Sequence, residues 1–202
     1  GMLQFKLLIY RYIFISHHLL FLLKSTHFLY KQEKQIDSLG IIIVAYINMC
    51  EMLGNHFFLL KEYDNAKHIY EELLNSSKFN TSIKIKLILC LIATNKIKKA
   101  FSIFYDLIIN NSWVLLNSDL VINKNICSEM IYSSKKNINN FKKKSDFFMV
   151  LGMLYAFVDT NYSIRYFRIL KNITKNKNKS KYRNLILTIL IIKNNGYSYS
   201  NN

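Results

Sequence analysis

Apolar residues in the middle of the chain recur at the three- and four-residue spacing of amphipathic helices, and the set repeats at a longer, fixed interval. The small residues Ala66, Ala100 and Ser134 follow one another at 34-residue intervals. Large apolar residues keep the same interval in four sets: Leu53, Leu87 and Val121; Tyr63, Ile97 and Ile131; Tyr70, Phe104 and Ile138; and Leu73, Leu107 and Phe141. A fixed period of this length is typical of stacked helical hairpins, each of which buries its apolar face against the next.

We therefore predict an all-α chain with three antiparallel helix-turn-helix repeats over residues 47–141. The small residue of each repeat is expected where the second helix crosses the first. The register is looser after the first repeat, because Gly54 is followed at the same interval by Ile88 and Ile122. Any helical bundle would show helical spacing, but a fixed period favours stacked repeats over a generic bundle.

Residues 142–202 predict a divergent fourth repeat and a basic C-terminal capping helix. The apolar segment that starts at Leu151 has the pattern of a first repeat helix. Arg168 occupies the small-residue position of this unit if the period is kept, whereas Ser163 would occupy it in a shorter unit. The largely apolar residues 183–193 form the predicted cap.

Residues 2–46 are predicted to form apolar N-terminal helices that act as a cap or an anchor. The apolar stretch 3–23 is interrupted by basic residues and histidines, which leaves its uninterrupted runs short for a membrane span. No small-residue cleavage site follows it, as a secretory signal would require. A buried helix, a targeting segment and a membrane attachment therefore all stay open for this stretch.

Composition supports helices and argues against a disulfide or metal framework. The chain of 202 residues is 51% hydrophobic and contains five glycines and no proline, which disfavours turn-rich β folds. Cys50, Cys90 and Cys127 lie far apart, and none belongs to a C-x-x-C pair or has a histidine at metal-ligand spacing. We expect free thiols in a reducing compartment, the cytoplasm, with an organelle or a membrane-associated location as the alternative. Neither a metal nor a cofactor is expected.

The first repeat resembles a tetratricopeptide repeat. Its matching residues are Met52, Leu53, Gly54, Phe57, Tyr63, Asp64, Asn65, Ala66, Tyr70, Leu73 and Leu74. The resemblance implies hairpins stacked into a right-handed superhelix whose concave groove binds a helix or an extended peptide of a protein partner. The positions expected at this groove are Asn55, His56, Cys90 and Lys124. The carboxylate clamp of some family members is not expected, because Glu51 stands where that clamp needs a lysine.

A second resemblance starts near Phe79. From there the order of features is similar to the C-terminal region of the intraflagellar transport protein 56 family, which is itself built of tetratricopeptide repeats. The matching features are Lys99-Ala100-Phe101, Trp113-Val114-Leu115-Leu116, Tyr132-Ser133-Ser134, Phe147-Phe148, Gly152 and a basic helical ending. This likeness implies docking of cargo or subunits during cilium assembly, without catalysis.

The formal charge of +16 is distributed unevenly along the chain. Residues 47–80 carry a net charge of −2, whereas residues 135–183 hold thirteen basic and two acidic residues. Such a basic stretch attracts RNA, anionic lipid or an acidic protein surface. Its candidate contact residues are Lys142, Lys143, Lys144, Arg165, Arg168, Lys171 and Lys175. A solvated face in a lysine-rich chain is the alternative explanation, because charge alone fixes no specific contact.

No catalytic motif is found in the sequence, which contains no G-x-S-x-G, no H-E-x-x-H and no glycine-rich phosphate loop. We therefore expect a non-enzymatic scaffold that mediates protein–protein interaction as a subunit of a larger assembly. One alternative is an RNA- or ribosome-associated repeat protein that uses the basic residues 135–183. Another is an adaptor attached to a membrane through residues 3–23.

Overall fold

The computed structural model describes residues 43–76, 81–115, 124–174 and 179–199. The regular structure in these ranges is α or 3₁₀ helix, without a strand, so the all-α prediction is confirmed for the part of the chain that is described. The predictions for residues 3–23, Val121, Ile122 and Lys175 lie outside the described residues. The chain divides into two compact units, Gly1–Met49 and Cys50–Asn202, and all the labelled helices belong to the second.

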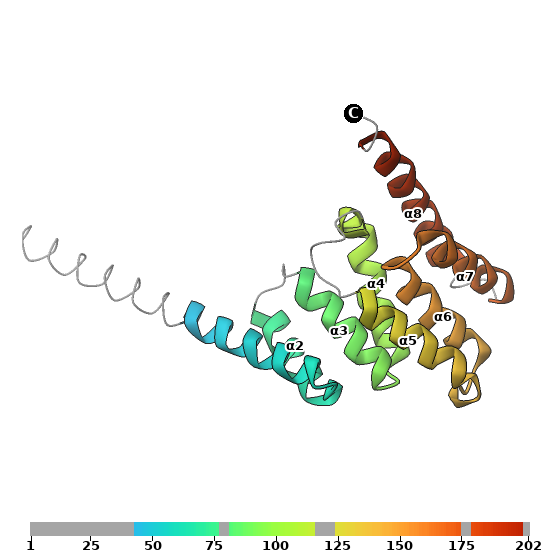
Figure 1. The fold of residues 1–202 in the computed structure, drawn as a ribbon. Helices are drawn as coiled ribbons and strands as arrows, with labels where there is room; N and C mark the ends of the chain where they lie inside the picture. The colour runs from blue at the N-terminus through green and yellow to red at the C-terminus, as the bar shows by residue number, and fades with distance from the viewer. Residues whose placement is uncertain (1–42, 77–80, 116–123, 175–178, 200–202) are drawn as a thin grey trace, which may run out of the picture. The chain divides into compact units, whose positions relative to one another are not determined.

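The described part of the second unit is a succession of helices (Figure 1). Its first ten residues, 50–59, are helical. The labelled helices that follow are α2 (Tyr63–Ser76), α3 (Thr81–Ala93), α4 (Ile97–Asn110), the 3₁₀ turn η1 (Ser112–Leu115), α5 (Lys124–Lys136), the 3₁₀ turn η3 (Ile138–Asn140), α6 (Lys144–Ala156), α7 (Thr160–Ile173) and α8 (Lys179–Tyr199).

Two consecutive hairpins have turns of the same design. The first hairpin pairs residues 50–59 with α2, and the second pairs α3 with α4. Lys61 and Asn95 occupy the left-handed region in these turns, with φ of 60° and 58°. In each turn the amide that follows the left-handed residue donates back to a carbonyl five residues earlier, Glu62 to Phe57 at 2.9 Å and Lys96 to Leu91 at 2.7 Å. This pattern is a helix C-cap that reverses the chain sharply.

The crossings of these two hairpins are closely packed. Ala66 and Ala100 are completely buried, as expected for residues at a helix crossing, and the large side chains one turn later, Tyr70 and Phe104, are completely buried as well. A Cβ atom added to Gly54 would lie 2.9 Å from Cε1 of Tyr70, so only glycine lets the ring approach so closely. Small residues and large rings therefore alternate across each crossing.

The third repeat predicted from the period is wrong, because no turn precedes Ile131. Residues Lys124–Lys136 form the single helix α5, and Ser134 is half-exposed on it. The position that corresponds to the left-handed residues Lys61 and Asn95 is Glu129, which lies inside α5. Nothing between Cys127 and Ile131 favours a chain reversal, because this segment lacks glycine, asparagine and proline.

A third hairpin is formed instead by α6 and α7. Ser163 is completely buried, and its hydroxyl donates to the carbonyl of Gly152 at 2.7 Å. A Cβ atom at Gly152 would lie 2.8 Å from Cε1 of Phe167. Arg168, the alternative position for the small residue, is exposed. The structure therefore places Ser163 at the crossing, as the sequence predicts for a unit shorter than 34 residues.

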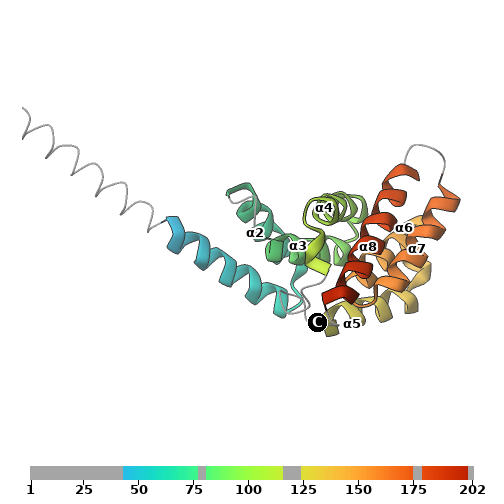
Figure 2. The same cartoon turned by 90° about the horizontal axis from the view of Figure 1, so that it is seen from above.

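An aromatic core joins the second hairpin to the third and to α8. Helix α4 packs against α6 and α8, and α8 also packs along α7 (Figure 2). The ring of Phe104 lies 5.9 Å from those of Phe157 and Phe167, and the ring of Phe101 lies 5.5 Å from that of Tyr182. Helix α5 packs against α6. One core thus extends from α3 to α8.

Candidate functional site

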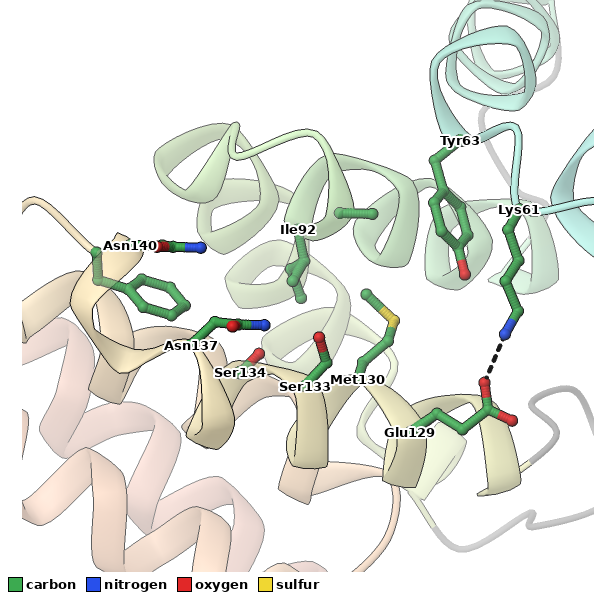
Figure 3. Close-up of a pocket in the computed structure, with 11 residues that line it drawn as sticks. Lys61, Tyr63, Ile92, Glu129, Met130, Ser133, Ser134, Asn137 and Asn140 are labelled. Atoms are coloured by element: carbon green, nitrogen blue, oxygen red, sulfur yellow. Dashed lines mark hydrogen bonds and ion pairs between the residues drawn. The ribbon is translucent and has the colours of Figure 1, made fainter.

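A cavity of about 420 Å³ opens between α5 and the ends of the first two hairpins (Figure 3). Its walls come from the first hairpin turn, the end of α3, α5 and the η3 turn. The lining residues are Lys61, Tyr63, Ile92, Ala93, Glu129, Met130, Ser133, Ser134, Asn137, Asn140 and Phe141. We call this cavity the α5 groove. Its volume lies within the range of small-ligand sites, so the groove is large enough to hold a chemical group of a partner.

Helix α5 contributes one face to the groove. Met130, Ser133, Ser134 and Asn137 are spaced three and four residues apart, which places them on one side of the helix. The buried residues Cys127 and Ile131 lie on the adjacent side and fix this orientation by packing into the core. Because the two serines are short, they leave the space in front of α5 open. The small residue at position 134 therefore creates a groove here, where the sequence predicts a helix crossing.

Four polar side chains in the groove have no partner within the described part of the chain. Ser133, Ser134, Asn137 and Asn140 make no side-chain hydrogen bond to another described residue. Together they offer hydroxyl groups and amides that both donate and accept hydrogen bonds. Figure 3 shows Ser133, Ser134 and Asn137 along α5, across the groove from Ile92. The groove thus combines neutral polar groups with apolar wall.

The rim of the groove is electrically neutral. Lys61 Nζ lies 2.9 Å from a carboxylate oxygen of Glu129, and both side chains are exposed. The hydrogen bond and the charge of Glu129 raise the pKa of Lys61, so Lys61 keeps its positive charge opposite this carboxylate. Burial raises the pKa of Tyr63, whose hydroxyl therefore stays protonated and able to donate. A ligand in this groove does not need a charge.

The four positions predicted for a concave groove do not form one surface. Asn55 accepts hydrogen bonds from the Tyr70 hydroxyl at 2.9 Å and from Lys86 Nζ at 2.7 Å, so it joins the first hairpin to α3. Burial lowers the pKa of Lys86 and raises that of Tyr70. His56 is exposed on the first hairpin, and Lys124 is exposed at the start of α5. Asn55 therefore has a structural role in the described unit.

The sequence analysis placed Cys90 at the concave groove, and the structure corrects this prediction. The Cys90 side chain is completely buried and cannot line a docking surface. Helix α3 packs against both α2 and α4, which buries nearly all of its circumference. Burial raises the pKa of the Cys90 thiol to about 12, as it does for Cys127. Both thiols are therefore protonated at neutral pH, and the thiolate that reacts with electrophiles or binds metals is suppressed.

The described members of the predicted basic patch lie at the start of α6 and on α7. Lys142, Lys143 and Lys144 are exposed at the start of α6. Arg165 and Arg168 are exposed on α7, whereas Lys171 is half-buried on the same helix. At 100° per residue, Lys171 points away from Arg165 by more than a quarter turn. Lys175 lies outside the described residues.

A second cavity of about 420 Å³ lies where α4 and α6 begin. The residues that line it are Asn95, Lys96, Ile97, Lys98, Lys99, Lys142 and Asp146. Of these, Lys142 belongs to the predicted basic patch. Lys99 is paired with Glu71 of α2 at 2.7 Å. The start of α6 and the start of α4 thus form one strongly basic end of the unit.

The α5 groove was missed by the sequence analysis. An amphipathic helix places polar residues outside its apolar stripe, so Ser133 and Ser134 beside the buried Cys127 and Ile131 match an ordinary solvated face. The groove depends on the elements opposite α5, which the sequence alone does not bring together.

Among the described residues, no three side chains of the metal-binding types gather into a cluster. None of the described helices is both long enough and apolar enough to cross a membrane. No protein-family model and no curated protein matches this chain.

Proposed function

We propose that this protein is a non-enzymatic helical-repeat scaffold, of the tetratricopeptide type, that binds an extended segment of a protein partner in the α5 groove. The observation that carries the proposal is the row of unpartnered Ser133, Ser134 and Asn137 side chains that faces the apolar wall at Ile92. As a subunit of a larger assembly, the protein would use this groove for docking. The resemblance to the intraflagellar transport family suggests transport assemblies as the setting.

The chemistry of the groove favours an extended peptide over a helix. A helix satisfies its backbone groups internally, so it has few donors and acceptors to offer to serine and asparagine side chains. An extended peptide exposes one N–H and one C=O at each residue, and an asparagine amide can bind both. Ile92, Met130 and Phe141 would hold an apolar side chain of the same segment.

The repeat type is supported by the first two hairpins. Their turns have left-handed residues and the same hydrogen bonds at a 34-residue interval, at Lys61 and at Asn95. Their buried small residues Ala66 and Ala100 occupy matching positions, as stacked repeats require. Helix α5 interrupts the series after the second hairpin, and the groove lies at this interruption. A repeat array that is broken by one inserted helix would therefore carry its docking site at the break.

The proposal is tested by selecting ligands from a random peptide library displayed on phage, with the full chain as bait. Selected peptides are then synthesised, and their dissociation constants are measured by fluorescence anisotropy. Ser134→Leu should fill the groove and weaken binding by at least about tenfold, because the peptide backbone loses its place beside α5. Tyr132→Ala is the matched control, because Tyr132 is 70% exposed on another face of the same helix.

Peptides that bind Ser134→Leu as tightly as the original chain would contradict the proposal, as would a selection that enriches no peptide. A loss of binding in Tyr132→Ala equal to that in Ser134→Leu would place the docking surface elsewhere on α5. Circular dichroism of each variant shows whether the helices are intact, so that a loss of binding can be attributed to the groove.

A further inference from the structure

Four aromatic rings form a row on the outer side of the third hairpin. Phe148 and Tyr155 come from α6, and Tyr162 and Tyr166 come from α7. From Phe148 to Tyr166 the ring centroids are 6.1 Å apart, from Tyr166 to Tyr155 5.6 Å, and from Tyr155 to Tyr162 5.0 Å. Their planes differ by 28°, 19° and 30°. The rings are therefore moderately inclined to one another and follow one another in a series, which we call the aromatic row.

The aromatic row lies outside the core. The core face of α7 is formed by Ser163, Ile164, Phe167 and Leu170, all of them buried. Tyr162 is 45% exposed, and the other three rings of the row are half-buried. The rings of the row cover part of one another, and Tyr162, at one end of the row, presents the most ring surface to solvent.

Cations accompany the row along its length. Lys144 Nζ lies 5.9 Å from the ring centroid of Phe148, and Lys135 Nζ lies 5.2 Å from that of Tyr155. Lys135 also donates a hydrogen bond to the Tyr155 hydroxyl at 2.8 Å. Arg165 is exposed between Tyr162 and Tyr166 in the sequence of α7. The row thus has positive charge at the Phe148 end, in its middle and on its α7 flank.

Negative charge is sparse in the surrounding stretch. The two acidic residues within 135–183 are Asp146 and Asp159. Asp159 accepts a hydrogen bond from the amide of Asn161 at 2.8 Å and so caps α7, and Asp146 lines the second cavity. Thirteen basic residues of the same stretch leave a strong positive excess. This field attracts polyanions to the hairpin that carries the aromatic row.

We infer that the aromatic row, with Lys135, Lys144 and Arg165 beside it, binds single-stranded nucleic acid. A base would stack on the exposed ring surface at the Tyr162 end of the row, and the phosphates of the strand would be neutralised by the three cations. Rings stack with every base, so this arrangement binds without a preferred sequence. Charge alone would suit any polyanion, whereas the rings add affinity only for a polyanion that carries bases.

Three of the four rings of the row are tyrosines, each with a polar end. A helix that lies in a membrane interface presents aliphatic residues such as leucine on its apolar face, in addition to aromatic residues. The face of α7 that carries Tyr162 and Tyr166 also carries Ile173, which is 51% exposed, so binding to lipid vesicles is the competing outcome of the test. This inference concerns a face different from the α5 groove, so it stands or fails separately from the proposed peptide binding.

The test compares two fluorescent DNA strands of equal length, a deoxyuridine 12-mer and an abasic 12-mer with the same phosphates but no bases. The full chain should bind the deoxyuridine strand more tightly than the abasic strand. Tyr162→Leu combined with Tyr166→Leu should weaken binding of the deoxyuridine strand by at least about tenfold, because base stacking is lost. The same double variant should bind the abasic strand as the original chain does.

Tyr162→Phe combined with Tyr166→Phe is the matched control, because it keeps both rings and should retain affinity within about twofold. Tyr162→Leu alone, at the most exposed ring of the row, replaces the double variant if the latter does not fold. Equal binding of the two strands by the original chain would overturn the inference. So would a leucine variant that binds the deoxyuridine strand normally, or one that loses only its binding to phosphatidylserine vesicles.

Discussion

The first two hairpins and the third pack their two helices against each other in a similar way, but their turns have different backbone conformations. In the first two, Lys61 and Asn95 take the left-handed conformation, and the same backbone hydrogen bond closes both turns at an interval of 34 residues. In the third, Phe157 stays right-handed, and the amide of Asp159 donates to the carbonyl of Tyr155 at 2.8 Å. The third turn has the same three residues between its helices but a different backbone conformation, and its helix α7 begins with a side-chain cap from Asp159.

What all three hairpins share is the crossing. Each second helix has a small residue and, four positions later, a large aromatic residue, and both are completely buried. The pairs are Ala66 with Tyr70, Ala100 with Phe104, and Ser163 with Phe167. The close approach of two helices therefore constrains the residues more strongly than the way in which the chain turns between them. Substitutions at the crossings should cost more than substitutions in the turns.

The largest effect is expected from enlarging a crossing residue. Ala100→Leu and Ser163→Leu each insert a branched side chain where no space exists, and each should lower the free energy of unfolding by about 3 kcal/mol. Ser163→Leu also removes the hydrogen bond to the Gly152 carbonyl. Urea denaturation followed by circular dichroism measures both losses. The two hairpins should respond alike, because the crossing is what they have in common.

Ser134→Leu is the control for this experiment, because Ser134 shares the 34-residue register of Ala100 but faces the open α5 groove. Its free energy of unfolding should change by less than about 0.5 kcal/mol, as is usual for positions with free space around them. Three equal losses would mean that the small residues are packed alike and that the groove is closed in solution.

The sequence was sufficient to predict that the described part of the chain is all-α and, through the period, that Ala66 and Ala100 are buried small residues, because matching turns recur at the same interval there. It misplaced Ser134, since a small residue at the right interval also occurs on α5 without a turn before it. The period also could not exclude Cys90 from the groove. Helix α3 is buried on almost all sides, so its sequence has no polar face that would reveal its orientation.

The candidate sites were less predictable than the fold. The spacing of Tyr162 and Tyr166 predicts that these rings share one face of α7, and the sequence shows Arg165 beside them. Their neighbours Phe148 and Tyr155 come from α6, and which rings meet depends on how the two helices are offset. The turn at Phe157 has the same three residues as the other turns but a right-handed backbone, and the sequence does not reveal this difference. The aromatic row therefore required the structure.

A smaller effect is expected at the start of the second helices. Asp159 caps α7 through its side chain, whereas Lys96, at the corresponding position of α4, makes no side-chain cap. Asp159→Ala should lower the free energy of unfolding by about 1 kcal/mol, because the amide of Asn161 loses its acceptor. Lys96→Ala should change it by less than about 0.5 kcal/mol. Equal losses in the two variants would show that the cap does not distinguish the two hairpins.

The smallest effect is expected from glycine substitutions in the turns. The change in the free energy of unfolding should have opposite signs in the two kinds of hairpin. Asn95 has a φ of 58°, which glycine adopts without steric cost, so Asn95→Gly should raise the free energy of unfolding by about 0.5 kcal/mol. Val158→Gly in the third turn should lower it, since no left-handed residue is present there and glycine adds only conformational freedom to the unfolded chain. Thermal melts of both variants measure the two signs. A gain in both would mean that the third turn also strains its backbone, and the distinction between the two turn designs would then be lost.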